Sequence, residues 1–265
     1  MVEINPDQYD SVRPLFSTLS HNRSIVFAVL EGNNAGRVFV DDPLQPQTAF
    51  LASITEFNFL AGDPSNESFN SQVKARLDTD MHPTSPYLLL FPASAPWKAA
   101  IDALWGSLPG EWTSRCEYDF RPQRLEARDS LQEVVPAGYT VRRYDASLAA
   151  SAPGLAEFWF NLDNFLANGF GFAVLHGDKP VSRCHSVAVG DDLAEISIET
   201  DEAYRRKGLA QLACRAFIEH CQRVSIIPHW SCWINNLPSQ ELAQKMGFVL
   251  VEQAPARVVF YRKGG

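Results

Sequence analysis

Two glutamates and a run of cations lie close together in one segment of the second half of the chain. The segment Glu195–Ala210 reads E-I-S-I-E-T-D-E-A-Y-R-R-K-G-L-A. If its first residues form a strand, Glu195 and Glu199 face the same side, because side chains alternate along a strand. Burial raises the pKa of a glutamate toward the range that suits a general base. The segment therefore carries two candidates for acid–base chemistry.

The cations after these glutamates precede the start of a predicted helix. Arg205, Arg206 and Lys207 are followed by Gly208, after which apolar residues recur at helical spacing. Glycine permits close approach of the backbone, and the first N–H groups of a helix attract anions. The arrangement favours a pyrophosphate site. Taken alone, the R-x-x-G-x-A pattern is a weak signal, because cations before a helix usually form a solvated face.

Two motifs of this chain resemble those of the GNAT superfamily of N-acetyltransferases. The coenzyme A-binding motif of that superfamily, Q/R-x-x-G-x-G/A, is met by Arg205, Gly208 and Ala210. The next motif, N-x-x-S-x-x-L-x-x-K-x-G-F, is met after the strand H-W-S-C-W-I by Asn236, Ser239, Leu242, Lys245, Gly247 and Phe248. Both motifs stand in the right order at the right spacing, and the resemblance covers roughly residues 139–262.

A narrower likeness lies in the phrase G-F-G-F-A-V-L-H-G-D-K-P-V-S, which spans Gly169–Ser182, and in E-A-Y-R-R-K-G-L-A. These phrases are most similar to the subgroup that includes zwittermicin A resistance-type acetyltransferases. The resemblance implies acetyl-coenzyme A as cosubstrate and a small-molecule amine as acceptor.

The resemblance also implies which residues hold the cosubstrate. The end of the strand, Ile198 to Thr200, pairs through its backbone with the pantetheine arm, and Asn236 hydrogen-bonds that arm where two central strands splay. The pyrophosphate is held by the N–H groups of Arg206, Lys207, Gly208, Leu209 and Ala210. From the residues alone, Asn236 is at least as well explained as a helix N-cap with Pro238 in the first turn, and the two roles are compatible.

Acetyl transfer to an amine needs a base, because the ammonium must lose a proton before its nitrogen can attack. Glu195 stands ten residues before Arg205, close to where some family members place their base, and Glu199 is nearer the thioester end. We predict that one of the two glutamates is the base. The alternatives are an anchor for the substrate ammonium or a surface carboxylate.

The departing thiolate needs a proton or a positive field. Many family members supply the proton from a Tyr in the run L-Y-x-K-x-G-F, but Ala243 occupies that position here. Three alternatives stay open for the proton: Ser239, which the resemblance places at the cosubstrate, a water molecule, or no residue at all.

Elements that would position these residues can be predicted across the second half. In chain order they are the strand Tyr139–Tyr144, the helix Pro153–Phe165, the antiparallel strands Gly171–Leu175, Pro180–Val189 and Ala194–Thr200, the helix Gly208–Gln222, the strand His229–Ile234, the helix Pro238–Met246 and a strand near Arg257–Arg262.

The first half shows a similar alternation. Its predicted elements are strands over Ser24–Leu30, Gly36–Val40, Thr48–Ile54 and Tyr87–Phe91, helices over Ser71–Asp78 and Trp97–Trp105, and a loop over Ala61–Asn70. That loop, Trp97 and Trp105 are candidates for one wall of the acceptor cleft, although an ordinary loop and core is the commoner explanation for such residues.

Mixed strands and helices predict an α/β or α+β fold. The resemblance specifies a GNAT fold, a central mixed and mostly antiparallel sheet flanked by helices, with an additional N-terminal α/β lobe. The stretch Leu131–Gly138 lacks a strong period and holds Pro136 and Gly138. We therefore predict an N-terminal lobe over residues 1–130 and a catalytic domain over residues 138–265. The N-terminal lobe could be a degenerate copy of the same fold.

Composition narrows the choice of partners. A net charge of −8 and a pI near 5.3 argue against nucleic acid, and the apolar runs are too short to span a bilayer. Five cysteines without paired spacing favour a cytoplasmic protein with no structural metal. A homodimer stays an open alternative.

Two functions of different classes fit the sequence. The first is an acetyl-coenzyme A-dependent N-acetyltransferase acting on a primary amine of a small molecule. The second is a non-catalytic acyl-coenzyme A sensor or scaffold, which Ala243 in place of Tyr mildly favours and the two strand glutamates disfavour.

Overall fold

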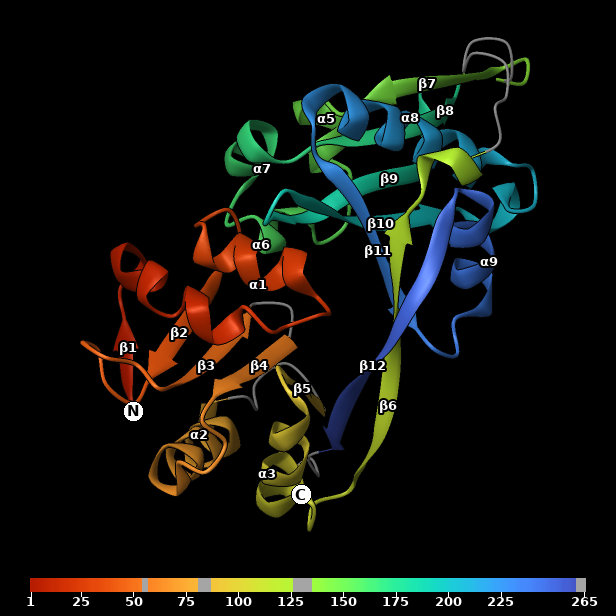
Figure 1. Cartoon of the computed structure of the whole chain (residues 1–265). Helices are drawn as coiled ribbons and strands as arrows, with labels where there is room; N and C mark the ends of the chain where they lie inside the picture. Colours follow the sequence, from red (N-terminus) through yellow and green to blue (C-terminus); the bar gives the residue numbers. More distant parts are fainter. Residues whose placement is uncertain (54–56, 81–86, 126–134, 261–265) are drawn as a thin grey trace. The chain divides into compact units, whose positions relative to one another are not determined.

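The computed structural model describes residues 1–53, 57–80, 87–125 and 135–260 (Figure 1). The chain forms two compact units. One comprises Met1–Arg115 together with the last strand from Gln253, and the other comprises Cys116–Glu252. Each is a mixed sheet covered by helices, which confirms the predicted α/β class.

The first unit is built on a sheet in the order β1-β2-β3-β4-β5-β12. Its neighbouring strands are antiparallel apart from the parallel pair β4 and β5. The strands are β1 (Val2–Ile4), β2 (Gly36–Val40), β3 (Thr48–Ser53), β4 (Phe57–Gly62), β5 (Tyr87–Pro92) and β12 (Phe248–Phe260). Short 3-10 helices cover Pro6–Ser11 and Arg13–Phe16.

Helices cover both faces of this sheet. Figure 1 shows α2 (Glu67–Asp80) and α3 (Ala95–Trp105) together on one face and α1 (Arg23–Leu30) on the other. Trp97 and Trp105 are fully buried in the core between the sheet, α2 and α3, and the Trp97 indole donates to the carbonyl of Gly62. Both tryptophans are therefore core residues, as the commoner explanation predicts.

The segment Ser24–Leu30 was predicted as a strand, and the structure corrects this to helix α1. All its residues from Ser24 onward are buried. A continuous apolar run carries no period that separates a buried strand from a buried helix, so β-branched residues such as Ile25 and Val26 misled the prediction. Strand β4 was not predicted, and its last two residues, Ala61 and Gly62, were assigned to the predicted loop.

The second unit has the strand order β6-β11-β10-β9-β8-β7. β7 to β10 are antiparallel neighbours, and β10 and β11 are parallel. The strands are β6 (Gly110–Phe120), β7 (Tyr139–Arg143), β8 (Gly171–His176), β9 (Lys179–Gly190), β10 (Leu193–Thr200) and β11 (Ile227–Trp233). The first residues of β6 belong to the first unit.

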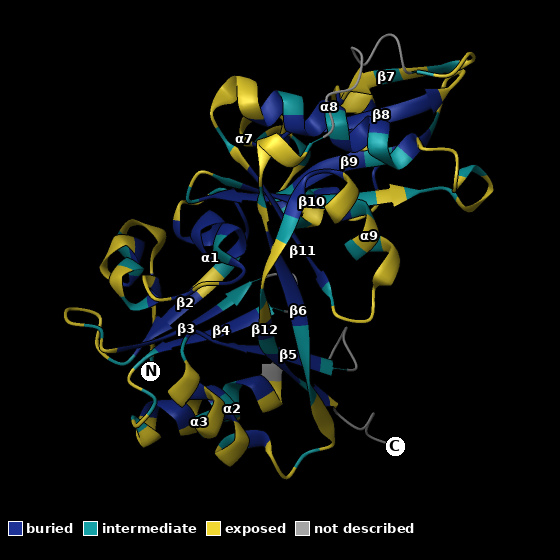
Figure 2. Cartoon of the chain, turned by 45° about the vertical axis from the view of Figure 1, so that its right-hand side comes forward, coloured by how far each residue is buried: buried dark blue, intermediate teal, exposed yellow. Residues whose placement is uncertain are grey.

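The helices of this unit are α5 (Ala146–Ala150), α6 (Leu155–Phe158), α7 (Leu162–Asn168), α8 (Leu209–Val224) and α9 (Leu237–Lys245), with 3-10 turns at Pro122–Arg124 and Glu202–Tyr204. α8 packs against β8, β9 and β10, and its apolar face lies in the main core. Figure 2 shows buried residues along the strands and exposed residues on the outer faces of the helices. Within the described ranges, no helix is long and apolar enough to cross a membrane.

The helix predicted over Pro153–Phe165 is broken into α6 and α7. The backbone of Phe160 has a φ of +62°, which ends the first helix, and the Asn161 side chain accepts from the N–H of Asn164 to cap the second. Asparagine favours such caps over helix interiors. The other elements predicted from Tyr139 to Met246 are confirmed within a few residues at their ends.

Half of the predicted boundary of 131–138 lies outside the described ranges, so that boundary stays a prediction. Residues 126–134 lie outside the described ranges, and the division falls at Arg115 and again at Glu252. The reason is that the second half of β12 returns to the first unit, where Arg257 to Phe260 pair with β5. Such pairing between distant segments leaves no local mark in the sequence.

Candidate functional site

The two central strands of the second unit run together and then separate. β10 and β11 are paired only over Leu193–Glu195 and Ile227–His229. Both strands continue beyond this ladder, β10 to Thr200 and β11 to Trp233, while β10 stays paired with β9. The backbone of Ile198 to Thr200 thus has an edge that β11 does not occupy, as strand-like pairing with an extended ligand requires.

The loop after β10 presents backbone donors to solvent. No backbone–backbone hydrogen bond within the described ranges uses the N–H groups from Arg206 to Ala210 as donors. Arg206 and Gly208 both have positive φ, +61° and +78°, and a Cβ on Gly208 would meet nothing within 4 Å. Successive N–H groups in such a turn at a helix N-terminus form a concave anion site.

Contacts with the β8–β9 hairpin hold this loop in place. Lys179 Nζ lies 2.8 Å from a carboxylate oxygen of Asp201, and the Tyr204 hydroxyl lies 3.2 Å from His176 Nδ1. The Lys207 ammonium lies 5.0 Å from the centroid of the Tyr204 ring. Arg205 turns back along the chain, where its Nε donates to the Thr200 carbonyl at 3.2 Å. These contacts therefore hold the loop after β10 in position, and the loop carries three exposed cations.

Asn236 caps helix α9, which confirms the N-cap interpretation. Its side-chain oxygen accepts from the N–H of Ser239 at 3.3 Å, and Pro238 lies in the first turn. The Ser239 hydroxyl accepts a hydrogen bond from the Trp230 indole at 3.1 Å. Ala243, where many relatives have Tyr, is fully buried in the core.

Glu195 is buried and accepts two hydrogen bonds from β11. Its Oε2 lies 2.5 Å from His229 Nδ1, and its Oε1 accepts from the Ser231 hydroxyl at 2.5 Å. His229 and Ser231 stand two residues apart and so face the same side of their strand. Only 2% of Glu195 is exposed, so the carboxylate is stabilised by these partners and not by bulk water.

His229 is held between two carboxylates. Its Nε2 lies 3.5 Å from Oε2 of Glu117, a residue of β6 that is 1% exposed. Burial lowers the pKa of His229, but the neighbouring charges of Glu195 and Glu117 outweigh this and raise it to about 9. His229, Ser231 and Glu117 were not predicted as site residues. The one signal available was the alternation of polar His229 and Ser231 along a strand next to β10.

The two glutamates of β10 therefore occupy different environments. Glu199 is exposed, and its carboxylate lies 3.6 Å from the Arg183 guanidinium of β9. Glu195 is enclosed at the last residue pair before β10 and β11 separate. Of the two, Glu195 is the carboxylate whose environment can shift its proton affinity strongly.

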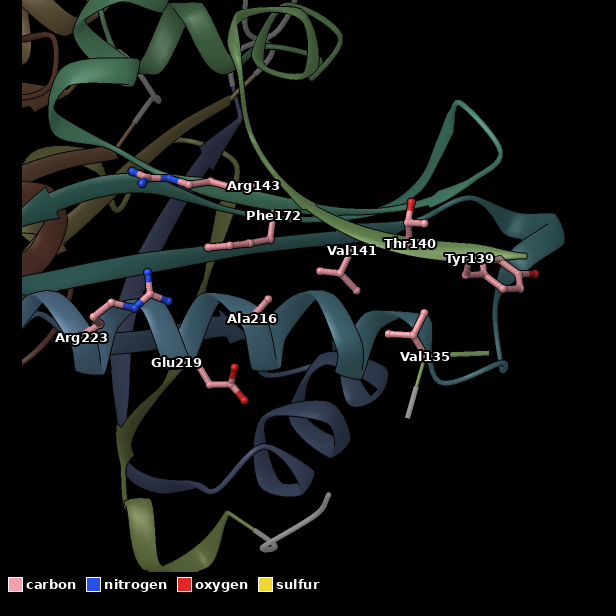
Figure 3. A pocket seen from close by; sticks show the side chains of 9 residues that line it. All are labelled: Val135, Tyr139, Thr140, Val141, Arg143, Phe172, Ala216, Glu219 and Arg223. Atoms are coloured by element: carbon pink, nitrogen blue, oxygen red, sulfur yellow. The ribbon is translucent and has the colours of Figure 1, made fainter. Parts of the chain in front are cut away.

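A cavity of about 450 Å³ lies beside α8, and none of the predicted site residues lines it (Figure 3). Its walls come from β7, Phe172 of β8 and the second half of α8. The lining residues are Val135, Tyr139, Thr140, Val141, Arg143, Phe172, Ala216, Glu219 and Arg223. Separately, in the part of the chain that the structure describes, no group of three or more His, Cys, Asp or Glu side chains is arranged to hold a metal ion.

Known proteins are similar to this chain in sequence or in fold. Residues 13–256 match the GNAT acetyltransferase family. The chain is 30% identical over 256 residues to the uncharacterized N-acetyltransferase YdfB of Bacillus subtilis (strain 168), covering 95% of each chain. A GCN5-related N-acetyltransferase-like protein from Streptococcus suis 89/1591 has a TM-score of 0.71 at 24% identity, covering 96% of this chain and 99% of that one. A tandem GNAT protein from the clavulanic acid biosynthesis pathway has a TM-score of 0.65 at 12% identity, covering 100% and 99%.

Proposed function

The chain belongs to the GNAT acetyltransferase family, and from this membership we propose that it transfers the acetyl group of acetyl-coenzyme A to a primary amine of a small molecule. The observation that carries the proposal is the loop after β10, whose N–H groups from Arg206 to Ala210 are not used by the backbone. A nucleotide cosubstrate with a pyrophosphate fits that loop.

Several groups support the binding of acetyl-coenzyme A. The exposed side chains of Arg205, Arg206 and Lys207 surround the loop with positive charge. Leu209 begins α8, so the helix dipole adds to the attraction for phosphate. The backbone from Ile198 to Thr200 would pair with the extended pantetheine arm, and Asn236 and Ser239 lie at the start of α9, which follows the free end of β11.

We propose Glu195 as the base. It is buried at the point where β10 and β11 separate, and its burial and partners are suited to tuning a carboxylate for proton transfer. Exposed Glu199 fits better as an anchor for the ammonium of the acceptor or as a surface carboxylate. The proton for the thiolate is proposed to come from the reacting amine itself, because Ala243 offers none. The Ser239 hydroxyl accepts from the Trp230 indole and keeps its own proton, so Ser239 is the second candidate donor.

The narrower likeness to zwittermicin A resistance-type acetyltransferases suggests an amine-containing antibiotic as the acceptor. This rests on the phrases Gly169–Ser182 and Glu202–Ala210 alone. A cytoplasmic location is proposed because all five cysteines are free in the structure, as a reducing compartment would keep them.

An acetyl-transfer assay with a panel of small amines tests the function. We expect release of the coenzyme A thiol only when both acetyl-coenzyme A and a suitable primary amine are present. Binding of acetyl-coenzyme A without transfer to any amine would contradict the proposal and favour a sensor.

A further inference from the structure

The carboxylate of Glu195 belongs to a line of three buried ionisable groups. Glu117 of β6, His229 of β11 and Glu195 of β10 lie on three adjacent strands, and we call them the buried row. We propose that the buried row acts as one general base, in which His229 and Glu117 are positioning residues that set how strongly Glu195 holds a proton. The inference rests on the proposed function.

The geometry links the three groups directly. Glu195 and His229 are register partners in the parallel ladder, so the 2.5 Å contact between Oε2 and Nδ1 joins neighbouring strands at the same level. His229 Nε2 then reaches Glu117 at 3.5 Å on the opposite side. One ring nitrogen of the imidazole thus faces each carboxylate, which fixes the orientation of the ring. The imidazole also couples the protonation of Glu195 to that of Glu117.

The charge of the buried row makes it a proton acceptor. If one proton is shared between two carboxylates and one imidazole, with the imidazole cationic, the row carries one net negative charge. Its members are at most 9% exposed, and burial disfavours a net charge on such a group. Binding a second proton removes the net charge. A lone glutamate beside a cationic histidine would have no such tendency.

Charged groups act on His229 from both neighbouring strands. Glu195 comes from β10, and Glu117 and Asp119 come from β6. On its own strand, the nearest polar partner of the row is the neutral hydroxyl of Ser231. Each of these three carboxylates is negative and favours the cationic form of the imidazole.

The acceptor ammonium gives one proton to the row, and its free amine attacks the thioester carbonyl carbon. A C–N bond forms and the C–S bond breaks. The second proton of the nitrogen leaves with the thiolate, so the products are the amide and the coenzyme A thiol, and the row returns its proton to solvent.

The test compares the pH dependence of kcat for two variants that change the row in opposite directions. Glu117→Gln removes a negative charge, so the row releases its proton more easily and the acid limb should move to lower pH by about one unit. His229→Gln removes the cation, so the acid limb should move to higher pH by roughly one to three units. The acceptor is the same throughout, so its own ionisation cannot produce shifts of opposite sign.

His220→Gln is the matched control. His220 is a buried histidine of the same unit that packs at a tilt against Phe170 and Phe172, and its Nδ1 lies 3.4 Å from the Arg223 guanidinium. Its substitution should leave the acid limb in place. If the acid limb of kcat lies at the same pH in all three variants while the wild type transfers acetyl groups, the row has no role in proton transfer. The proposed function would still hold in that case.

A second measurement needs no acceptor and no variant. Imidazole nitrogen shifts of histidine-labelled wild-type protein should show one histidine that remains cationic well above neutral pH, as two flanking carboxylates require. A spectrum in which every histidine is neutral at pH 8 would overturn the row. If the wild type transfers acetyl to no amine at all, the proposed function fails and this inference falls with it, whatever the histidine spectrum shows.

Discussion

His229 Nδ1 lies 2.5 Å from Glu195 Oε2, across the last residue pair of the ladder between β10 and β11. The contact therefore stands at the point where the two strands begin to separate. Because each residue belongs to a different strand, a change in the pair affects both the proton chemistry of the site and the join between the strands. The predictions below separate these two effects.

Glu195→Gln should lower kcat by about 10²- to 10⁴-fold at neutral pH, the usual cost of losing a general base, while acetyl-coenzyme A binds normally. The loss should shrink at high pH, where the acceptor amine is already neutral. Steady-state kinetics together with calorimetric titration measure both quantities. Glu219→Gln is the control, because Glu219 is a half-buried carboxylate on α8 that pairs with Arg215. Near-normal turnover of Glu195→Gln alongside a large loss in Glu199→Gln would transfer the role of base to Glu199.

Gly208→Glu should weaken acetyl-coenzyme A binding by about 1–2 kcal/mol from the negative charge added at the helix start alone. The new carboxylate would stand among the N–H groups intended for pyrophosphate. Gly32→Glu is a matched control, since Gly32 also has a positive φ and open space around its Cα but lies in the first unit. Calorimetry that gives equal affinities for both variants would show that the phosphate site lies elsewhere.

The free energy of unfolding should decrease as the pH rises, because of His229. Its pKa is raised from 6.5 to about 9 on folding, so its contribution is fully present below pH 6.5 and is lost as the pH rises through 9. The shift corresponds to on the order of 3 kcal/mol. We expect urea denaturation to show this decline in the wild type and not in His229→Gln.

His185→Gln serves as the contrasting variant for that measurement. Burial lowers the pKa of His185 to about 4, so its contribution is present above pH 6.5 and is lost as the pH falls toward 4. This variant should retain the decline between pH 6.5 and 9. An unchanged decline in His229→Gln would mean that another group causes it.

Asn236 can be tested for its two roles separately. Asn236→Ala should destabilise the protein by about 1 kcal/mol, because α9 loses its N-cap. Asn236→Asp keeps a good cap, so thermal stability should recover. If the amide also donates to the pantetheine arm, Asn236→Asp should still raise KM for acetyl-coenzyme A. A normal KM in the Asp variant would restrict Asn236 to capping.

Local patterns in the sequence predicted much of the second unit. The three antiparallel strands, helix α8 and the turn before it follow from alternation, turn residues and helical spacing, all of which act over a few residues. The same patterns failed for α1, where an unbroken apolar run has no period, and for β4 and β6, whose residues gave no clear strand signal.

The buried row could not be predicted from the sequence, and the reason is a different one. Glu117 stands far from Glu195 along the chain, and only the strand order β6-β11-β10 brings both to His229. That order depends on which strands pair, a property of the whole sheet and not of any segment. A buried glutamate in a strand also breaks the usual apolar pattern, so Glu117 weakened the very signal that would have revealed β6.

Strands β6 and β12 are each divided between the two units, which limits where this protein can be truncated. A fragment that begins at residue 138 would lack β6, and β11 would then present an unpaired edge strand, which invites aggregation. The same fragment would lose Glu117 and leave His229 with one carboxylate. The segment from residue 138 onward is therefore not an independent structural module. Fusion, truncation or shuffling between relatives should keep the chain whole from Cys116 onward and retain the first unit that β6 and β12 connect to it.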